Sequence, residues 1–267
     1  MEKPKFEIEV KDLVKKFGDI TAVDDISFTV QEGEIFAFLG PNGAGKTTAI
    51  KMLTTLLKPT SGKILVNGFD PTKDPYNVRC SFGIVFQDPS LDEELTAYEN
   101  LQFHGVLYGI TGEKLKNEIK KLLNLVELWD RRNEFVKNYS GGMKRRLEIA
   151  RCLIHDPKIL FLDEPTLGLD PQTRNHIWSY IKKLSDERQM TIFFTTHYMD
   201  EAERVAEKIA IIDYGKIKVQ GSPQELLSQT KTKTLEEAFL KLTGKEIRDD
   251  KSSAADRMRT AKRAWGR

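Results

Sequence analysis

The sequence is short of cysteine, of long apolar runs and of net charge. Its 267 residues include two cysteines, Cys80 and Cys152, in unrelated contexts, which indicates reduced thiols in a cytosolic protein rather than a disulfide framework. No apolar run approaches the roughly 20 residues that a membrane span needs, and the N-terminal segment is too charged for a signal peptide. A formal net charge of +2 excludes the bulk attraction to nucleic acid that strongly basic proteins have.

Strand-like and helix-like segments alternate along most of the chain. This alternation predicts an α/β fold with a largely parallel sheet. Between about residues 89 and 156 the pattern changes to helices with no convincing strand, and strands resume at Lys158. We therefore expect an α/β core at 1–88 and 157–222, a helical insertion at 89–156 and C-terminal helices at 223–244.

A glycine-rich loop, GPNGAGKTT at 40–48, connects an apolar segment to a helix expected at 45–57. It matches G-x-x-x-x-G-K-[ST], the phosphate-binding pattern, in the required strand–loop–helix context. Glycines let backbone N–H groups converge on phosphate oxygens, and the helix N-terminus adds partial positive charge. Lys46 is expected to reach the β- and γ-phosphates, and the Thr47 hydroxyl to bind Mg²⁺. The expected nucleotide-binding residues are Gly40, Pro41, Asn42, Gly43, Ala44, Gly45, Lys46, Thr47 and Thr48.

A second acidic centre follows the apolar segment 159–162. A buried strand there would deliver Asp163 and Glu164 at its carboxyl end, where ligands bind in open α/β sheets. Asp163 is expected to hold Mg²⁺, directly or through water, and Glu164 to polarise the attacking water as general base. Because two adjacent carboxylates repel each other, a metal and a phosphate-bound water explain this pair better than a structural role.

Two further polar residues end strand-like segments. Gln87 lies where the helical insertion begins and could reach Mg²⁺ or the attacking water, and the imidazole of His197 could contact the γ-phosphate. Position alone leaves a structural role for each of them equally open. The histidines that we expect to be structural are His104, His155 and His176.

The segment YSGGMKRRLEIA, 139–150, reads as a helix with a weak first turn. From Met143 on, its apolar side chains form one stripe. Ser140 is a suitable N-cap, but Gly141 and Gly142 follow it, and each weakens a helix by roughly 1 kcal/mol relative to alanine. The basic residues that lie largely off the apolar stripe are Lys144, Arg145, Arg146 and Arg151.

The order of these motifs resembles the ATP-binding-cassette (ABC) family of nucleotide-binding domains, over about residues 5–242. The resemblance implies an α/β P-loop NTPase (RecA-like) core with an N-terminal antiparallel β subdomain and an inserted α-helical subdomain. It implies ATP and Mg²⁺ as cofactors and ATP hydrolysis as the activity. Phe17 matches the aromatic residue that stacks on adenine, although a core role is the alternative. By position, Gly40–Thr48 is similar to the Walker A loop, Gln87 to the Q-loop glutamine, Ser140–Gly142 to the signature, Asp163 and Glu164 to Walker B with the catalytic carboxylate, Asp170 to the D-loop aspartate and His197 to the switch histidine.

In this family the signature completes the ATP site of a second subunit. Two chains pair head to tail, and each ATP is held between one Walker A loop and the partner's signature helix. A positive helix end with bare glycines lets N–H groups approach a γ-phosphate closely. The resemblance therefore implies that the chain pairs, with itself or with a homologous nucleotide-binding subunit, around two ATP. Hydrolysis then opens the pair.

Tyr139 and Met143 stand where many members of the family have Leu and Gln. With the neighbouring sequence, they make the chain similar to the ATPase subunits of drug- and lipid-exporter systems of the daunorubicin-resistance type, whose permease is a separate chain. This resemblance implies a peripheral location at the cytoplasmic face of the cell membrane. Residues 89–103 are the expected docking surface for the permease.

Three alternatives remain beside the exporter subunit. An importer ATPase is the near one, and a soluble ABC ATPase acting on DNA or ribosomes belongs to another class. The single cassette, the lack of a long coiled-coil insertion and the low net charge speak against the soluble ATPase, so no specific nucleic acid is expected as a partner. Glu164 disfavours the third, a protein that binds nucleotide without hydrolysing it.

The end of the chain differs from the rest in charge. Residues 245–267 carry eight basic and four acidic side chains. They are interpreted either as a solvated end or as a basic amphipathic element that contacts a membrane surface or a partner.

Overall fold

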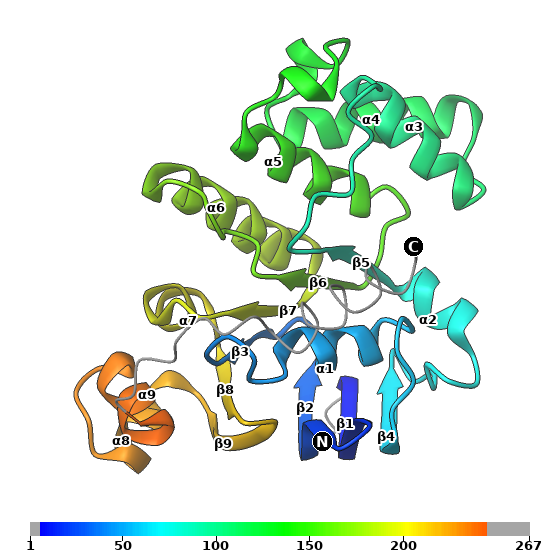
Figure 1. Ribbon diagram of the computed structural model, residues 1–267. Coiled ribbons are helices and arrows are strands. Elements are labelled where there is room, and N and C mark those ends of the chain that lie inside the picture. The colour runs from blue at the N-terminus through cyan, green and yellow to red at the C-terminus, as the bar shows by residue number, and fades with distance from the viewer. Residues whose placement is uncertain (1–5, 245–267) are drawn as a thin grey trace, which may run out of the picture.

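The computed structural model describes residues 6–244, so the basic end at 245–267 lies outside the described residues. Its strands form a small antiparallel sheet of order β2-β1-β4 and a larger sheet of order β5-β6-β7-β3-β8-β9 (Figure 1). The larger sheet is parallel from β5 to β8, and β9 pairs antiparallel at its edge. In chain order the strands are β1 (Phe6–Phe17), β2 (Ile20–Gln31), β3 (Ile35–Leu39), β4 (Ser61–Val66), β5 (Phe82–Val85), β6 (Ile159–Asp163), β7 (Thr191–Thr196), β8 (Lys208–Asp213) and β9 (Lys216–Gly221).

Helices cover both faces of the larger sheet. In chain order they are α1 (Lys46–Leu53), α2 (Pro75–Ser81), α3 (Ala97–Leu107), α4 (Gly112–Leu125), α5 (Gly141–Cys152), α6 (Pro171–Arg188), α7 (Met199–Val205), α8 (Pro223–Thr230) and α9 (Leu235–Thr243), with short 3₁₀ turns at Trp129–Arg131 and Val136–Asn138. Within the described part of the chain, no helix combines the length and the apolar character needed to cross a bilayer.

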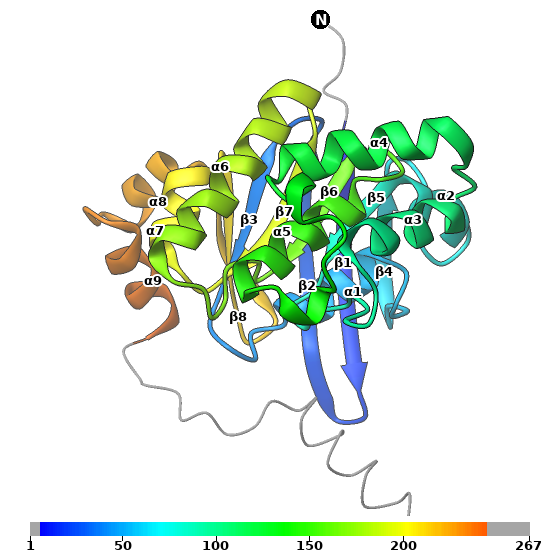
Figure 2. The same cartoon turned by 90° about the horizontal axis from the view of Figure 1, so that it is seen from above.

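The central strand β3 shows why these strands are apolar throughout. Each of its five residues is buried, because layers cover both faces of the sheet. Phe36 and Phe38 point into a core that α1 and the smaller sheet close, and Phe36 stacks on Phe193 at 5.4 Å. Ala37 and Leu39 point into a second core on the other face, under α3, α4, α5 and α6. Figure 2 shows α4, α5 and α6 lying over this face.

The predicted fold class is confirmed: an α/β fold with an antiparallel β subdomain and helices where the sequence changes character. Two local expectations differ from the structure. The helix expected at 45–57 ends at Leu53, because Thr54 caps it and Thr55 has a left-handed φ of 66°. The helix α2 was not predicted, although Asp74, its N-cap, and Pro75 in its first turn are standard helix-start signals.

Candidate functional site

Three neighbouring strands bring the predicted site residues to one edge of the larger sheet. The loop 40–45 follows β3, Asp163 ends β6, and His197 follows β7 directly. Because β6, β7 and β3 are adjacent and parallel, their carboxyl ends meet at the edge where α/β folds bind ligands. The structure thus gathers residues that lie more than a hundred positions apart in the chain (Figure 1).

Glycine is required at both ends of the phosphate-binding loop. A Cβ on Gly40 would lie 2.5 Å from the Ile212 carbonyl oxygen, and one on Gly45 would lie 2.4 Å from that of Ala22. Gly45 also has a φ of 107°, which side chains other than hydrogen rarely permit. The loop can therefore turn tightly into α1 and direct the first N–H groups of that helix inward.

Lys46 lies inside this loop rather than in solvent. Its ammonium donates to the carbonyl oxygens of Gly40 at 2.7 Å and Pro41 at 3.2 Å. It also forms an ion pair with Glu164 Oε1 at 3.1 Å, and both side chains are more than 90% buried. A buried positive charge framed by a glycine loop is a group that phosphate oxygens can bind.

Asp163 and Thr47 form an oxygen-only cluster beside Lys46. The Asp163 carboxylate accepts from the Thr195 hydroxyl at 2.6 Å and from the Thr47 hydroxyl at 3.3 Å. Burial raises the pKa of Asp163, and the two threonine hydroxyls offset part of that rise. A carboxylate and a hydroxyl are hard oxygen donors of the kind that Mg²⁺ prefers, so the residues present fit a magnesium ion.

Glu164 has an unusual backbone conformation, and its carboxylate lies between the Lys46 ammonium and the His197 imidazole. Its φ is 49°, uncommon for a residue other than glycine, and its N–H donates to the Thr195 carbonyl and hydroxyl oxygens. Its carboxylate bonds to Lys46 and, at 2.8 Å, to His197 Nδ1. Burial acts to raise the pKa of Glu164, but His197 and Lys46 outweigh it and the pKa is lowered. An ionised carboxylate in this position can accept a proton from water.

His197 is therefore part of the assembled site, whereas Gln87 and Phe17 lie at its margin. The Gln87 side chain is exposed, and its carbonyl oxygen accepts a bond from Arg145 at 3.5 Å. The Phe17 ring is half-buried under the Lys15 ammonium, 5.0 Å away. Phe17 ends β1 in the hairpin whose second strand presents Ala22 to the phosphate loop. Their proposed contacts with Mg²⁺, water and adenine remain predictions.

The signature segment lies on the sheet face opposite to α1. Ser140 caps α5 by accepting from the Met143 N–H at 3.3 Å, and the apolar side of α5 packs into the core that α1 does not reach. Gly141 is exposed and has room for a Cβ, which would make an ordinary contact with Leu169 Cδ2 at 3.7 Å. Gly142 is packed, because its Cβ would lie 2.6 Å from Thr173 Cγ2. Glycine at 142 thus also has a packing reason, because Thr173 leaves no room for a larger residue.

Asp170 begins the helix against which Gly142 packs. Its Oδ1 accepts from the N–H groups of Gln172 and Thr173, and its Oδ2 accepts from the Thr173 hydroxyl at 2.6 Å. The hydroxyl and N–H of Thr173 lower the pKa of Asp170. The start of the signature helix and the predicted D-loop aspartate are therefore joined through Thr173.

Two residues of the site were missed in the sequence. Thr195 bonds both Asp163 and Glu164, and the signal for it was the pair Thr195 and Thr196 at the end of a largely apolar strand, since buried polar groups need partners. Arg145 was placed off the apolar stripe of its helix, yet it is 7% exposed. Its guanidinium reaches carbonyl oxygens outside the helix, and helical periodicity cannot reveal such contacts.

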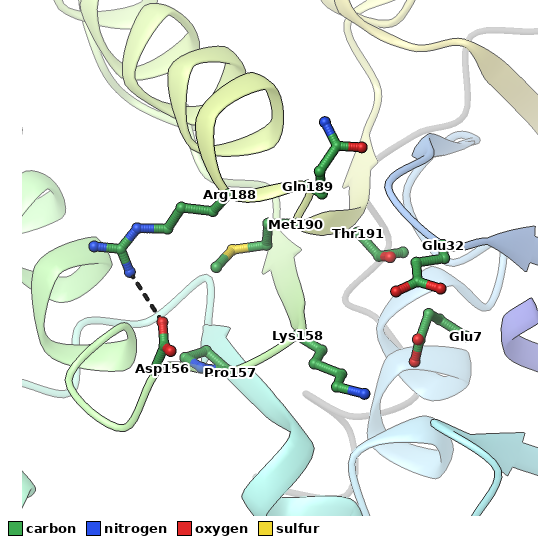
Figure 3. Close-up of a pocket in the computed structure, with 9 residues that line it drawn as sticks. All are labelled: Glu7, Glu32, Asp156, Pro157, Lys158, Arg188, Gln189, Met190 and Thr191. Carbon is green, nitrogen blue, oxygen red and sulfur yellow. Dashed lines mark hydrogen bonds and ion pairs between the residues drawn. The ribbon is translucent and has the colours of Figure 1, made fainter.

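A separate hollow of about 230 Å³ lies at the opposite ends of the strands, by the amino ends of β6 and β7 (Figure 3). Arg188 pairs with Asp156 there at 3.3 Å. The polar residues that line it include Glu7, Glu32, Asp156, Lys158, Arg188 and Thr191, and none of them belongs to the predicted nucleotide site.

Comparisons with known proteins show the family that this chain is similar to. A sequence model of the family described as ABC transporter matches residues 23–167. The chain is 43% identical to the daunorubicin/doxorubicin resistance ATP-binding protein DrrA of Streptomyces peucetius, over 83% of this chain and 67% of that protein. It is 41% identical to the linearmycin resistance ATP-binding protein LnrL of Bacillus subtilis, over 83% of this chain and 71% of that protein. Among solved structures, the dimeric post-hydrolysis state of the cassette MJ0796 with ADP and Pi superposes with a TM-score of 0.73 at 28% identity, over 80% of this chain and 98% of that chain.

Proposed function

We propose, from the premise that this chain belongs to the ABC transporter family, that it pairs around two ATP and drives a separate membrane permease as the motor of an exporter. The chain is an ATP-binding subunit and an ATPase, as the family match establishes. The observation that carries the proposal is the chain of contacts from Lys46 through Glu164 to His197 at the phosphate loop. It joins a phosphate-binding cation to a general base and to the residue that orients that base.

The proposed hydrolysis uses these residues in turn. Lys46 and the loop N–H groups bind the phosphates, and Thr47 and Asp163 would hold Mg²⁺. When bound, Mg²⁺ supplies positive charge that offsets the charge of the phosphates. Phosphate competes with Glu164 for the Lys46 ammonium, which frees Glu164 Oε1 to take a proton from water. His197 holds Oε2 and so fixes the direction of the base.

The proposed dimer places the partner's γ-phosphate at Ser140–Gly142. The exposure of Gly141 supports this, because the residue lies at the surface and carries no side chain. The N-terminus of a helix of this length carries partial positive charge that favours an anion. The dimeric state of the related cassette with ADP and Pi also supports a paired arrangement.

An exposed apolar surface on α3 supports a permease as partner. Phe103 and Leu107 are 67% and 70% exposed, and Val106 lies beside them. They line a groove of about 410 Å³ that begins at Leu95, within the predicted docking segment 89–103, and continues to Leu107 beyond it. Apolar side chains gathered in this way mark interaction surfaces. The resistance proteins that resemble this chain favour an exporter at the cytoplasmic face of the membrane, and no observation favours a partner made of nucleic acid.

The test is recovery of an integral membrane protein from native membranes with the tagged chain. The double variant Phe103→Asp/Leu107→Asp should lose that protein while the isolated chain keeps its ATPase activity. Tyr76→Asp is the matched control, since Tyr76 is as exposed as Leu107 but lies on α2. Equal recovery with the double variant and the control would overturn the docking surface. Failure of the wild-type chain to bind any integral membrane protein would overturn the transporter role.

A further inference from the structure

Arg145 joins the signature helix to both catalytic segments of its own chain. Its guanidinium donates to the Phe86 carbonyl oxygen at 2.6 Å and reaches those of Gln87 and Glu164, each at 3.5 Å. It also pairs with Glu148 one turn further along α5, at 3.0 Å. One buried side chain on α5 thus holds the ends of β5 and β6 together.

A second set of bonds fastens the same loop further along. Glu148 is 2% exposed, and its Oε1 accepts from the Ser90 N–H at 2.8 Å. Arg151 donates to the Ser90 carbonyl oxygen at 2.5 Å and also bonds the Ser90 hydroxyl. The segment 86–90, which contains Gln87, is therefore bonded to α5 at both of its ends.

Apart from its ion pair with Glu148, Arg145 contacts backbone carbonyls, and this decides its role. It touches neither the carboxylate of Glu164 nor the amide of Gln87, so it sets where these residues lie rather than what they do chemically. If the guanidinium were removed, three carbonyl oxygens and Glu148 would lose a charged donor in a buried place, which is a costly loss. The turn after β6 would then lose this bond to α5, and the loop would keep only its bonds at Ser90.

We propose that Arg145 is a positioning residue. When the ATP held by the partner contacts Ser140–Gly142, Arg145 transmits the resulting shift of α5 to this chain's own Gln87 and Glu164. The inference rests on the proposed head-to-tail pairing around ATP. Ser140 and Arg145 lie five residues apart on one helix, about 7 Å along its axis, so a displacement of the capped end moves the guanidinium with it. Within each chain Arg145 couples the two ATP sites of the dimer, beside the bonds that Glu148 and Arg151 make to Ser90.

Arg146 provides the matched control. It follows Arg145 directly, carries the same charge and is only partly buried. It donates to the Val126 carbonyl oxygen at 2.9 Å and pairs with Glu127 at 3.5 Å, and both of these partners lie in the helical insertion. Arg146 therefore stabilises the insertion without touching a catalytic segment.

The experiment compares Arg145→Gln, Arg145→Lys and Arg146→Gln in ATP turnover measured against ATP concentration. Arg145→Gln should lower kcat by between about 10-fold and 100-fold, the effect of a displaced catalytic group, and bring the Hill coefficient from above 1 toward 1. Binding of a fluorescent ATP analogue to the monomer should change by less than about twofold, because the phosphate loop is untouched. Arg145→Lys should restore part of kcat, and Arg146→Gln should leave kcat and the Hill coefficient near wild type.

The inference would be overturned if kcat fell equally in Arg145→Gln and Arg146→Gln and in proportion to the fall in unfolding temperature. Arg145 would then have a structural role only. A wild-type Hill coefficient of 1 would also overturn it. If Arg145→Gln does not fold, Glu148→Gln tests the same anchor and should give a smaller change in the same direction. Failure of the underlying function is distinguishable, because the wild-type chain itself would then show no ATP turnover or no ATP-dependent pairing.

Discussion

Replacement of Gly141 by alanine separates the stability of the signature helix from its function. Gly141 is the first residue of α5 and has no left-handed φ, so alanine can adopt its conformation. Its added Cβ would make an ordinary van der Waals contact with Leu169 Cδ2 at 3.7 Å and no clash with another element. The substitution removes backbone freedom from the unfolded chain and should raise the free energy of unfolding by between about 0.4 and 1 kcal/mol.

The same methyl group should impair hydrolysis. If the partner's phosphate approaches the backbone at this point, the Cβ pushes it away from at least one N–H donor. A hydrogen bond to a charged group contributes about 1.5–3 kcal/mol, so its loss corresponds to roughly a 10-fold to 100-fold fall in turnover. We therefore expect a chain that is more stable and less active.

The assays are urea unfolding of the nucleotide-free protein and steady-state ATP turnover. Gly142→Ala is the comparison, because its Cβ would lie 2.6 Å from Thr173 and disturb the Thr173 bond to Asp170. It should lose both activity and about 1–3 kcal/mol of stability, as overpacked sites do. A fully active Gly141→Ala variant would refute the close approach of phosphate, and a destabilised one would refute the room for a Cβ at this position.

Two further predictions concern pH. Burial, the charge of Arg151 and the neighbouring His155 lower the pKa of His104 to about 4, so the unfolded chain takes up a proton that the folded chain refuses between pH 6.5 and 4. The free energy of unfolding should fall by up to about 3 kcal/mol as pH drops through that window, and the fall should shrink in His104→Phe but not in a variant of the exposed His176. Because the bond from His197 helps to lower the pKa of Glu164, His197→Gln should move the acid limb of the ATPase pH profile to higher pH as well as reduce turnover. An unmoved acid limb would contradict the assignment of Glu164 as the base.

The parts of the site that depend on local sequence could be predicted. The apolar strand before Asp163 and the glycine loop before Lys46 each carry their own signal, because strand burial and tight turns constrain residue types locally. The parallel sheet followed from the alternation of strands and helices, which is why the meeting of these residues at one edge was expected.

The parts that depend on distant contacts could not be predicted. Arg145 is buried by carbonyl groups about sixty positions away in the chain, and Gly142 is packed by a threonine of another helix. The groove that we propose for docking extends past 103, because the exposed side chains of α3 continue to Leu107. These features belong to packing between elements, and a pattern within one element reports only its own faces.

In the proposed dimer each chain carries two half-sites for ATP, the phosphate loop and the segment Ser140–Gly142, which are completed by a partner. The most direct test is the mass of the Glu164→Gln variant with and without ATP and Mg²⁺, measured by sedimentation. That variant should bind ATP without turning it over and pass from monomer to dimer. Adding Ser140→Asp keeps the N-cap of α5 but places a negative charge against the partner's phosphate, so the double variant should bind ATP and stay monomeric. Adding Ser140→Asn instead keeps the cap without the charge and should restore the dimer. A Glu164→Gln chain that stays monomeric with ATP, or that dimerises equally well with Ser140→Asp, would contradict the account.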